Sequence, residues 1–369
     1  MEDRSSAHAE PTLSLRGIIS TNDDPLRCDK CSGLLPLGKM KSFAHPCCGK
    51  MLCAFCLNGT GTGRSCPACG TDFSPSGSKR LLKKNAKKDH PWAQHYLARL
   101  HQLGQSGMVQ SDFEAVRWFR KAASSGHPWS MLQLGHLLCV GSGCDQDLTM
   151  AVEYAERVMG AHNAFFAEDA CTLLVHVAEQ CFLAGNSTRA MSMLSPLAES
   201  GHPLAMYKLS FVIYHDGDHP TALKWLEEAF IKSNSANDHE HLAAESAYQA
   251  VKWSIELRND PRAKFWLVVT SKRLRVLLSN CGNPKEIVQF VSAVRRGLRK
   301  IRNTCGACGA PLHGAMRKKC GGCKTYCYCN RDCQKAHWNR SEGGHREQCK
   351  GAIELKAKMK EARKKGVPE

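Results

Sequence analysis

A short motif that returns along the middle of the chain constrains the fold more than any other feature. The segment His90-Pro91-Trp92-Ala93 recurs as His127-Pro128-Trp129-Ser130 and as His202-Pro203-Leu204-Ala205, with weaker copies at His162-Asn163-Ala164 and His241-Leu242-Ala243. The copies stand about 35 to 40 residues apart, which is the period of helical repeats. After each copy an alanine precedes a large side chain by three positions: Ala115/Trp118, Ala151/Tyr154, Ala190/Met193, Ala222/Trp225 and Ala263/Trp266. The chain is therefore predicted to stack similar units in tandem.

The residue types in the motif indicate that each unit contains two helices. Proline fits the first turn of a helix, where its missing N–H is not needed. Gly126 and Gly201, directly before two of the His-Pro pairs, can end the preceding helix in the left-handed conformation. Alanine lets neighbouring helices approach closely, and the large side chain three positions on fills the space between units. Because the histidines recur at equivalent turns, we expect them to cap or pack helices.

A glycine pattern in the second unit carries a resemblance to a known family. With Leu134-Gly135 and Gly141-Ser142-Gly143, residues 90–270 resemble the Sel1-like variety of tetratricopeptide-like repeat. The third and fifth units of this chain match the repeat pattern less well and are degenerate. The resemblance implies a right-handed helical solenoid that acts as a protein-binding scaffold.

Cysteine usage points to metal binding. The chain has 21 cysteines, most of them in two clusters at residues 28–69 and 305–349. Pairs separated by two residues are typical of zinc sites in a reducing compartment, where thiols ligate metal instead of forming disulfides. No signal-peptide pattern is evident, and no segment approaches the roughly 20 apolar residues that span a bilayer. We therefore expect an intracellular zinc-binding protein, in the cytoplasm or nucleus, that does not enter a membrane.

Eight possible zinc ligands lie at regular offsets in the C-terminal cluster. Two residues between cysteines let both reach one ion from a tight turn, and three place two ligands one helical turn apart. The segments from Cys323 to Cys329 and from Cys333 to Trp338 make this region resemble the MYND zinc finger. That resemblance implies two zinc ions with interleaved ligands: Cys305, Cys308, Cys329 and Cys333 for the first, and Cys320, Cys323, His345 and Cys349 for the second.

The MYND resemblance also implies a function. Such fingers typically bind proline-rich peptides, so Tyr328, Gln334 and Trp338 are expected to line a peptide groove that recognises a preformed polyproline segment. Packing in the small core is the alternative role of Trp338. Cys327 is expected to be a spare thiol that binds no metal. Trp338 and His345 stand further apart than in the family, which implies an enlarged loop between them.

The N-terminal cluster follows the ligand order of a cross-braced RING finger. Its candidate ligands are Cys28, Cys31, Cys47, Cys48, Cys53, Cys56, Cys66 and Cys69. Lys50 stands where a RING finger has histidine, so Cys47 and Cys48 would act together, with His45 in reserve. RING fingers recruit a ubiquitin-conjugating enzyme, but Lys30 and Gly70 replace the usual contact residues. With both clusters, the chain is expected to bind about four Zn²⁺ ions.

These observations predict a mainly α protein, in which a helical-repeat solenoid is flanked by two small zinc-stabilised modules, one RING-like and one MYND-type. The expected parts are a disordered tail (1–25), a RING-like module (26–73), a basic linker (74–89), the repeats (90–270), a helical connector (271–303), the MYND-type finger (304–350) and a basic C-terminal helix or tail (351–369).

The leading functional prediction is an adaptor without catalytic residues, which binds protein partners through the repeats and through the MYND groove. A RING-type ubiquitin ligase that selects substrates with its repeats is the alternative, and it would be the only enzyme activity expected. Nucleic-acid binding is a weaker alternative, suggested by the net charge of +17 and the basic stretch from Arg295 to Arg302. Zinc thiolates offset part of that charge, and the basic tail lacks the aromatics of a single-strand binder.

Overall fold

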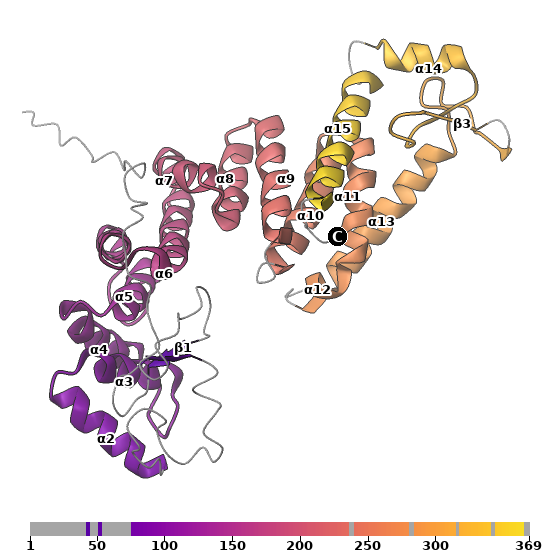
Figure 1. The fold of residues 1–369 in the computed structure, drawn as a ribbon. Coiled ribbons are helices and arrows are strands. Elements are labelled where there is room, and N and C mark those ends of the chain that lie inside the picture. The colour runs from indigo at the N-terminus through magenta and orange to yellow at the C-terminus, as the bar shows by residue number, and fades with distance from the viewer. Residues whose placement is uncertain are drawn as a thin grey trace, which may run out of the picture. The chain divides into compact units, whose positions relative to one another are not determined.

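Helices form nearly all of the ordered framework in the computed structural model (Figure 1). The structure describes residues 42–44, 51–53, 75–235, 240–279, 284–314, 317–340 and 344–364. The chain divides into two compact units, Met1–Pro196 and Leu197–Glu369, and each unit is described by itself.

The first unit contains a short hairpin and the first repeats. Strands β1 (Ser42–Ala44) and β2 (Met51–Cys53) pair antiparallel, with Phe43 opposite Leu52. The helices are α2 (Pro75–Lys87), α3 (Pro91–Leu103), α4 (Asp112–Ser124), α5 (Pro128–Val140), α6 (Leu148–Leu183) and α7 (Ser187–Glu199), whose last residues fall in the second unit.

The second unit contains the remaining repeats and the C-terminal cysteine cluster. Its helices are α8 (Pro203–His215), α9 (His219–Ser235), α10 (Glu240–Glu256), α11 (Asp260–Lys272), α12 (Leu274–Ser279), α13 (Pro284–Arg302), α14 (Arg331–Trp338) and α15 (His345–Lys364). Strands β3 (Lys318–Lys319) and β4 (Cys327–Tyr328) pair antiparallel, with Lys318 opposite Tyr328.

Three of the repeated histidines stand at helix N-caps, and two of them, His127 and His202, cap with their side chains. His90, His127 and His202 share one extended backbone conformation, with φ near −72° and ψ of 111° to 114°, and proline follows each at the first helical position. The Nδ1 atoms of His127 and His202 accept hydrogen bonds from the backbone N–H groups of Ser130 and Ala205, at 3.3 and 3.2 Å. Imidazole therefore takes the capping role that serine or aspartate usually has.

The glycine pattern of the second unit has steric causes. Gly135 on α5 faces Leu173 of α6 so closely that a Cβ atom would overlap the leucine side chain. Gly143 lies against the backbone of Asp112 at the start of α4 and has a φ of +71°, so a Cβ atom there would clash and strain the chain. The adjacent Ser142 hydroxyl donates to the Asp112 carboxylate. Glycine is required at both positions because two chain segments meet there.

The third unit differs from the two-helix prediction. Helix α6 runs without a break from Leu148 to Leu183, so the second helix of the second unit and the first helix of the third are one helix. The physical reason is that Asn163 stands where the first, second and fourth units have proline, and asparagine can continue a helix. The turn that separates helices elsewhere is therefore missing at this point.

Residues 75–87 form a helix, although a basic linker was predicted for 74–89. Leu82 and Ala86 of α2 are buried against Ala93 and Leu97 of α3, so α2 covers the first repeat helix. The lysines of this segment lie on the exposed side of the helix. Apolar residues four apart explain the difference, because they give α2 one face that can be buried.

The C-terminal helices share a core with the last repeats. Ile287, Val291 and Leu298 of α13 and Leu355 and Met359 of α15 belong to one buried cluster. The same cluster contains Phe230 of α9 and Trp266 of α11. A basic helix or tail was predicted for residues 351–369; residues 351–364 are part of helix α15, and one face of this helix is packed. No helix among the described residues is long and apolar enough to cross a membrane.

Candidate metal centre

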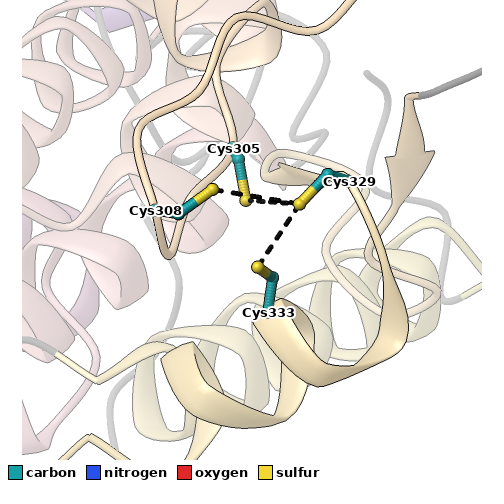
Figure 2. Close-up of side chains that lie close together, drawn as sticks. All are labelled: Cys305, Cys308, Cys329 and Cys333. Carbon is teal, nitrogen blue, oxygen red and sulfur yellow. Dashed lines mark hydrogen bonds between the residues drawn. The ribbon is translucent and has the colours of Figure 1, made fainter.

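The first group of predicted ligands comes together from two sides (Figure 2). Cys305 and Cys308 lie in the turn that follows α13, whereas Cys329 follows β4 and Cys333 lies in the first turn of α14. Asn330 caps α14, because its side chain accepts a hydrogen bond of 2.8 Å from the Cys333 N–H. The Sγ atom of Cys329 is 3.3 to 3.9 Å from those of the other three cysteines.

The second group is buried. Cys320 and Cys323 lie in the turn between β3 and β4, and His345 and Cys349 lie one turn apart at the start of α15. The Nε2 atom of His345 is 3.3 Å from the Sγ atom of Cys320 and 3.4 Å from that of Cys323. Cys320 and Cys349 are 3.7 Å apart at Sγ. These are the two sets that the sequence predicted, and within each set all donor atoms lie within 4.8 Å of one another.

The distances fit tetrahedral zinc. With Zn–S bonds of about 2.3 Å, the edge of a tetrahedron between two sulfur atoms is about 3.8 Å, and an edge to imidazole nitrogen is slightly shorter. The observed separations of 3.3 to 3.9 Å lie close to those edges. Cys₄ and Cys₃His donor sets without an open position are typical of structural zinc. The two groups therefore fit two Zn²⁺ ions that stabilise the fold.

The protein surroundings favour thiolate at one cysteine of each group, whereas a hydrogen bond to Cys329 raises the pKa of Cys333 to about 12 and burial raises the pKa of Cys349. A hydrogen bond from Cys320 is the largest cause that lowers the pKa of Cys323, to about 3, although burial opposes it. Burial raises the pKa of Cys305, but hydrogen bonds from the backbone N–H groups of Cys308 and Cys329 outweigh it and lower the pKa to about 6. Zinc binds the deprotonated form of cysteine, so these donors prepare the sites for metal.

Glycine is needed beside the second group. A Cβ atom on Gly322 would lie 2.8 Å from the Sγ atom of Cys349 and 2.8 Å from Ile353. The turn between Cys320 and Cys323 can therefore contact α15 only through a residue without a side chain. Cys327 belongs to neither group in the described part of the chain; it is buried on β4.

The three predicted peptide-binding residues have different surroundings. Tyr328 is fully buried, and its hydroxyl lies 3.0 Å from the Nδ1 atom of His337, so it belongs to the core and does not line a surface groove. The reason is that Tyr328 lies on β4, where both residues are buried in the core of the module. Gln334 and Trp338 of α14 are half-buried. Trp338 packs on the same core, with its ring edge-on to His345 at 5.9 Å between centroids.

Sequence reasoning missed the aromatic core of this module and its attachment to the repeats. The rings of Tyr326, His337 and His345 contact one another, with centroids 4.8 to 5.4 Å apart. The Tyr326 hydroxyl donates a hydrogen bond of 2.6 Å to Asp260 at the start of α11, and Gln348 donates to the Arg258 carbonyl at 3.0 Å. Only the apolar spacing of Leu355 and Met359 on α15 could have indicated this attachment.

Comparisons with known proteins agree with both parts of the fold. The profile of the Sel1 repeat matches residues 93–127, 130–157 and 203–232, and the profile of the MYND finger matches residues 305–349. A search of curated proteins finds no match.

Two solved structures illustrate the likeness of the repeats. A Sel1 repeat protein from Oxalobacter formigenes is 21% identical over 55% of this chain and 82% of its own, with a TM-score of 0.40. The protein c5321, a protective antigen of uropathogenic Escherichia coli with an SLR fold, is 17% identical over 61% of this chain and 50% of its own, with a TM-score of 0.39. The two family profiles show that this chain contains Sel1 repeats followed by a MYND zinc finger.

Proposed function

We propose that the protein is an adaptor, in which the MYND finger docks a proline-rich segment of one partner and the repeats hold a second partner. Sel1 repeats and a MYND finger together indicate a protein-interaction protein. The observation that carries the proposal is the closed ligand set of both metal groups. Neither group leaves a position for a substrate, so the metal would serve structure and leave recognition to the surface.

Gln334 and Trp338 are the residues proposed to contact the peptide. Both are half-buried and lie four residues apart, on one face of α14. A partly exposed tryptophan offers a rigid apolar surface to a polyproline segment, which loses little conformational entropy on binding. Trp338 also packs on the core, so its two roles have to be separated by experiment.

The test compares Gln334→Ala and Trp338→Ala in the full chain. The probe is a labelled peptide rich in proline and leucine, and the control peptide has alanine in place of proline. Loss of a buried aromatic anchor commonly weakens binding by about 2 kcal/mol or more, so Trp338→Ala should raise the Kd at least about tenfold. Gln334 is not part of the core cluster, so Gln334→Ala should weaken binding while zinc content and thermal stability stay unchanged. If both variants bind the proline-rich peptide as tightly as the unmodified protein does, this face of α14 is excluded as the binding site.

The ligase alternative depends on the N-terminal cysteines. Apart from Cys53, which ends β2, the proposed ligands of the RING-like module lie outside the described residues, so this module and its two zinc ions stay predictions. An autoubiquitination assay with a panel of conjugating enzymes tests the alternative. Activity that disappears in Cys53→Ala would favour the ligase over the adaptor.

A further inference from the structure

Two grooves lie side by side on the exposed face of α11. The first, of about 320 Å³, lies between α11, α15 and the turn at Cys323 and Lys324. The second, of about 490 Å³, lies between α11 and α13. Lys264, Val268 and Lys272 line both grooves. Because they are four residues apart on one helix, they form a ridge between the grooves.

The walls of both grooves are basic. Apart from the metal ligand Cys323, every charged residue that lines either groove in the described part of the chain is a lysine or an arginine. The first groove adds Arg273, Lys324 and Lys356 to the ridge lysines, and the second adds Arg295, Arg299 and Arg302. The result is a continuous cationic surface that spans the last repeat and the MYND finger.

Backbone carbonyls hold two lysines of the first groove in place. Lys264 donates to the backbone carbonyl of Lys324, and Lys356 donates to that of Cys323 at 3.3 Å. Each ammonium group has three donors, so these bonds leave donors for a ligand. A carbonyl oxygen fixes the position of an ammonium group but does not neutralise its charge, so the field of the groove stays positive.

The floor of the first groove is apolar. Phe230, Phe265 and Met359 line it, and Val268 on the ridge is 55% exposed. The groove therefore combines lysines on its rim with an apolar lining, of which Val268 is the exposed part. The surface is complementary to a ligand that carries carboxylates beside one or two apolar side chains.

We propose that this double groove docks an acidic segment of a partner protein, which inserts an apolar side chain over Val268 and Met359 and places carboxylates against Lys264, Lys324 and Lys356. The proposal rests on the adaptor function and supplies the chemistry of the partner that the last repeat holds. A nucleic acid would match the charge but not the floor. Phe230 is 1% exposed and Phe265 is half-buried, so the grooves offer no stacking platform for bases.

The two binding surfaces of the second unit are separate. Of the described residues, Gln334 and Trp338 line neither groove. The double groove uses the turn at Cys323, whereas the face proposed for proline-rich peptides lies on α14. Both ligands can therefore bind one molecule at the same time.

The experiment measures fluorescence polarisation of a labelled peptide that has glutamates around a central Leu-Phe pair, with full-length zinc-loaded protein. Lys356→Glu places a like charge against the peptide and should raise the Kd about tenfold or more. Its matched control is Lys360→Glu, which makes the same charge change on the same helix outside the grooves. Val268→Ser should weaken binding several-fold, and its control is Val288→Ser, because Val288 is 44% exposed on α13 and lines neither groove.

The outcomes separate the two proposals. Equal binding by Lys356→Glu and Lys360→Glu, with zinc content unchanged, overturns the acidic-segment proposal. A second result would also overturn it: single-stranded DNA binds more tightly than the peptide, and its binding is weakened by Arg299→Glu but not by Val268→Ser. That pattern would assign the surface to nucleic acid. Trp338→Ala should weaken the proline-rich peptide and leave the acidic peptide bound, because Trp338 lines neither groove. If Trp338→Ala leaves proline-rich binding unchanged, that result counts against the peptide face of α14 and not against the double groove.

Discussion

The hydroxyl of Tyr326 donates a hydrogen bond of 2.6 Å to the Oδ2 atom of Asp260. This bond joins the zinc finger to the second helix of the last repeat, across a sequence separation of 66 residues. The zinc finger is therefore packed against the repeats and is not a separate domain on a linker. It is attached to α11 by this bond, to the Arg258 carbonyl through Gln348, and to α9 by the ion pair of Lys358 with Glu228 at 2.9 Å.

Removal of the Tyr326 hydroxyl should loosen this attachment. A hydrogen bond to a charged group contributes about 1.5 to 3 kcal/mol, so Tyr326→Phe should lower the unfolding free energy of the second unit by that amount. Burial raises the pKa of Asp260 and the bond from Tyr326 lowers it, so the variant should also leave the carboxylate less stable in its charged form. Urea unfolding and the rate of zinc release to a chelator measure the effect. Tyr154→Phe is the control; an equal loss there would contradict the assignment.

Substitutions of two histidines test how much the side-chain caps contribute to stability. His127→Ala removes a side-chain acceptor from the start of α5 and should cost about 1 kcal/mol of stability, whereas His127→Asn keeps an acceptor and should cost less. His90→Ala is the matched control, because His90 has the same backbone conformation but no side-chain cap hydrogen bond. Thermal unfolding of the full chain gives the comparison. A larger loss for His90→Ala than for His127→Ala would show that stacking on Trp92 matters more than capping.

Two half-buried histidines predict a pH dependence of the repeats. Burial is the main cause that lowers the pKa of His95 to about 3 and that of His136 to about 4, from 6.5. Nearby His127 and Arg99 act on His95 in the same direction, as His176 does on His136. The unfolded chain takes up protons near pH 6.5 while the folded histidines stay neutral, so stability should fall as the pH decreases from 6.5 towards 4.

The slope of that fall identifies its source. Each histidine contributes at most about 1.4 kcal/mol per pH unit in this window. His95→Gln and His136→Gln should each reduce the slope in urea unfolding at a series of pH values. Zinc is also lost in acid, but that loss is common to all variants. His215→Gln, at an exposed position with a side chain 73% accessible, should keep the slope of the unmodified protein.

Glycine at position 143 should be intolerant of substitution. Gly143→Ala has to place a Cβ atom against the backbone of Asp112 and to keep a φ of +71°. Gly185→Ala has the same kind of backbone strain, with a φ of +83°, but open space around the new Cβ atom. The left-handed conformation costs about 1 to 2 kcal/mol, so Gly185→Ala measures strain alone. Gly143→Ala should lower the melting temperature clearly further; equal effects would mean that the two segments can move apart.

Metal content tests the ligand assignment. The full chain should bind about four zinc ions in native mass spectrometry, of which two belong to the C-terminal groups. Cys349→Ala should lose one of these two ions, because Cys349 belongs to the Cys₃His group. Cys327→Ala should lose none, since this thiol is buried outside both groups. Loss of an ion in Cys327→Ala would require a different ligand set.

The sequence by itself determined the repeats and the two metal groups, because both depend on local spacing. Proline after each histidine starts a helix wherever it occurs, and cysteines two or three residues apart reach one ion whatever surrounds them. The fusion within α6 could also be predicted in principle, since it depends on one missing proline at Asn163.

Only the tertiary structure decided the role of residues whose spacing is ambiguous. Tyr328 and Trp338 both lie in the segment between Cys323 and His345, yet Tyr328 on β4 is fully buried and Trp338 at the end of α14 is half-buried. The basic face of α11 becomes a pair of grooves only where α13 and α15 pack on either side of it. Such contacts join residues far apart in the chain, and no local pattern encodes which distant surfaces will meet.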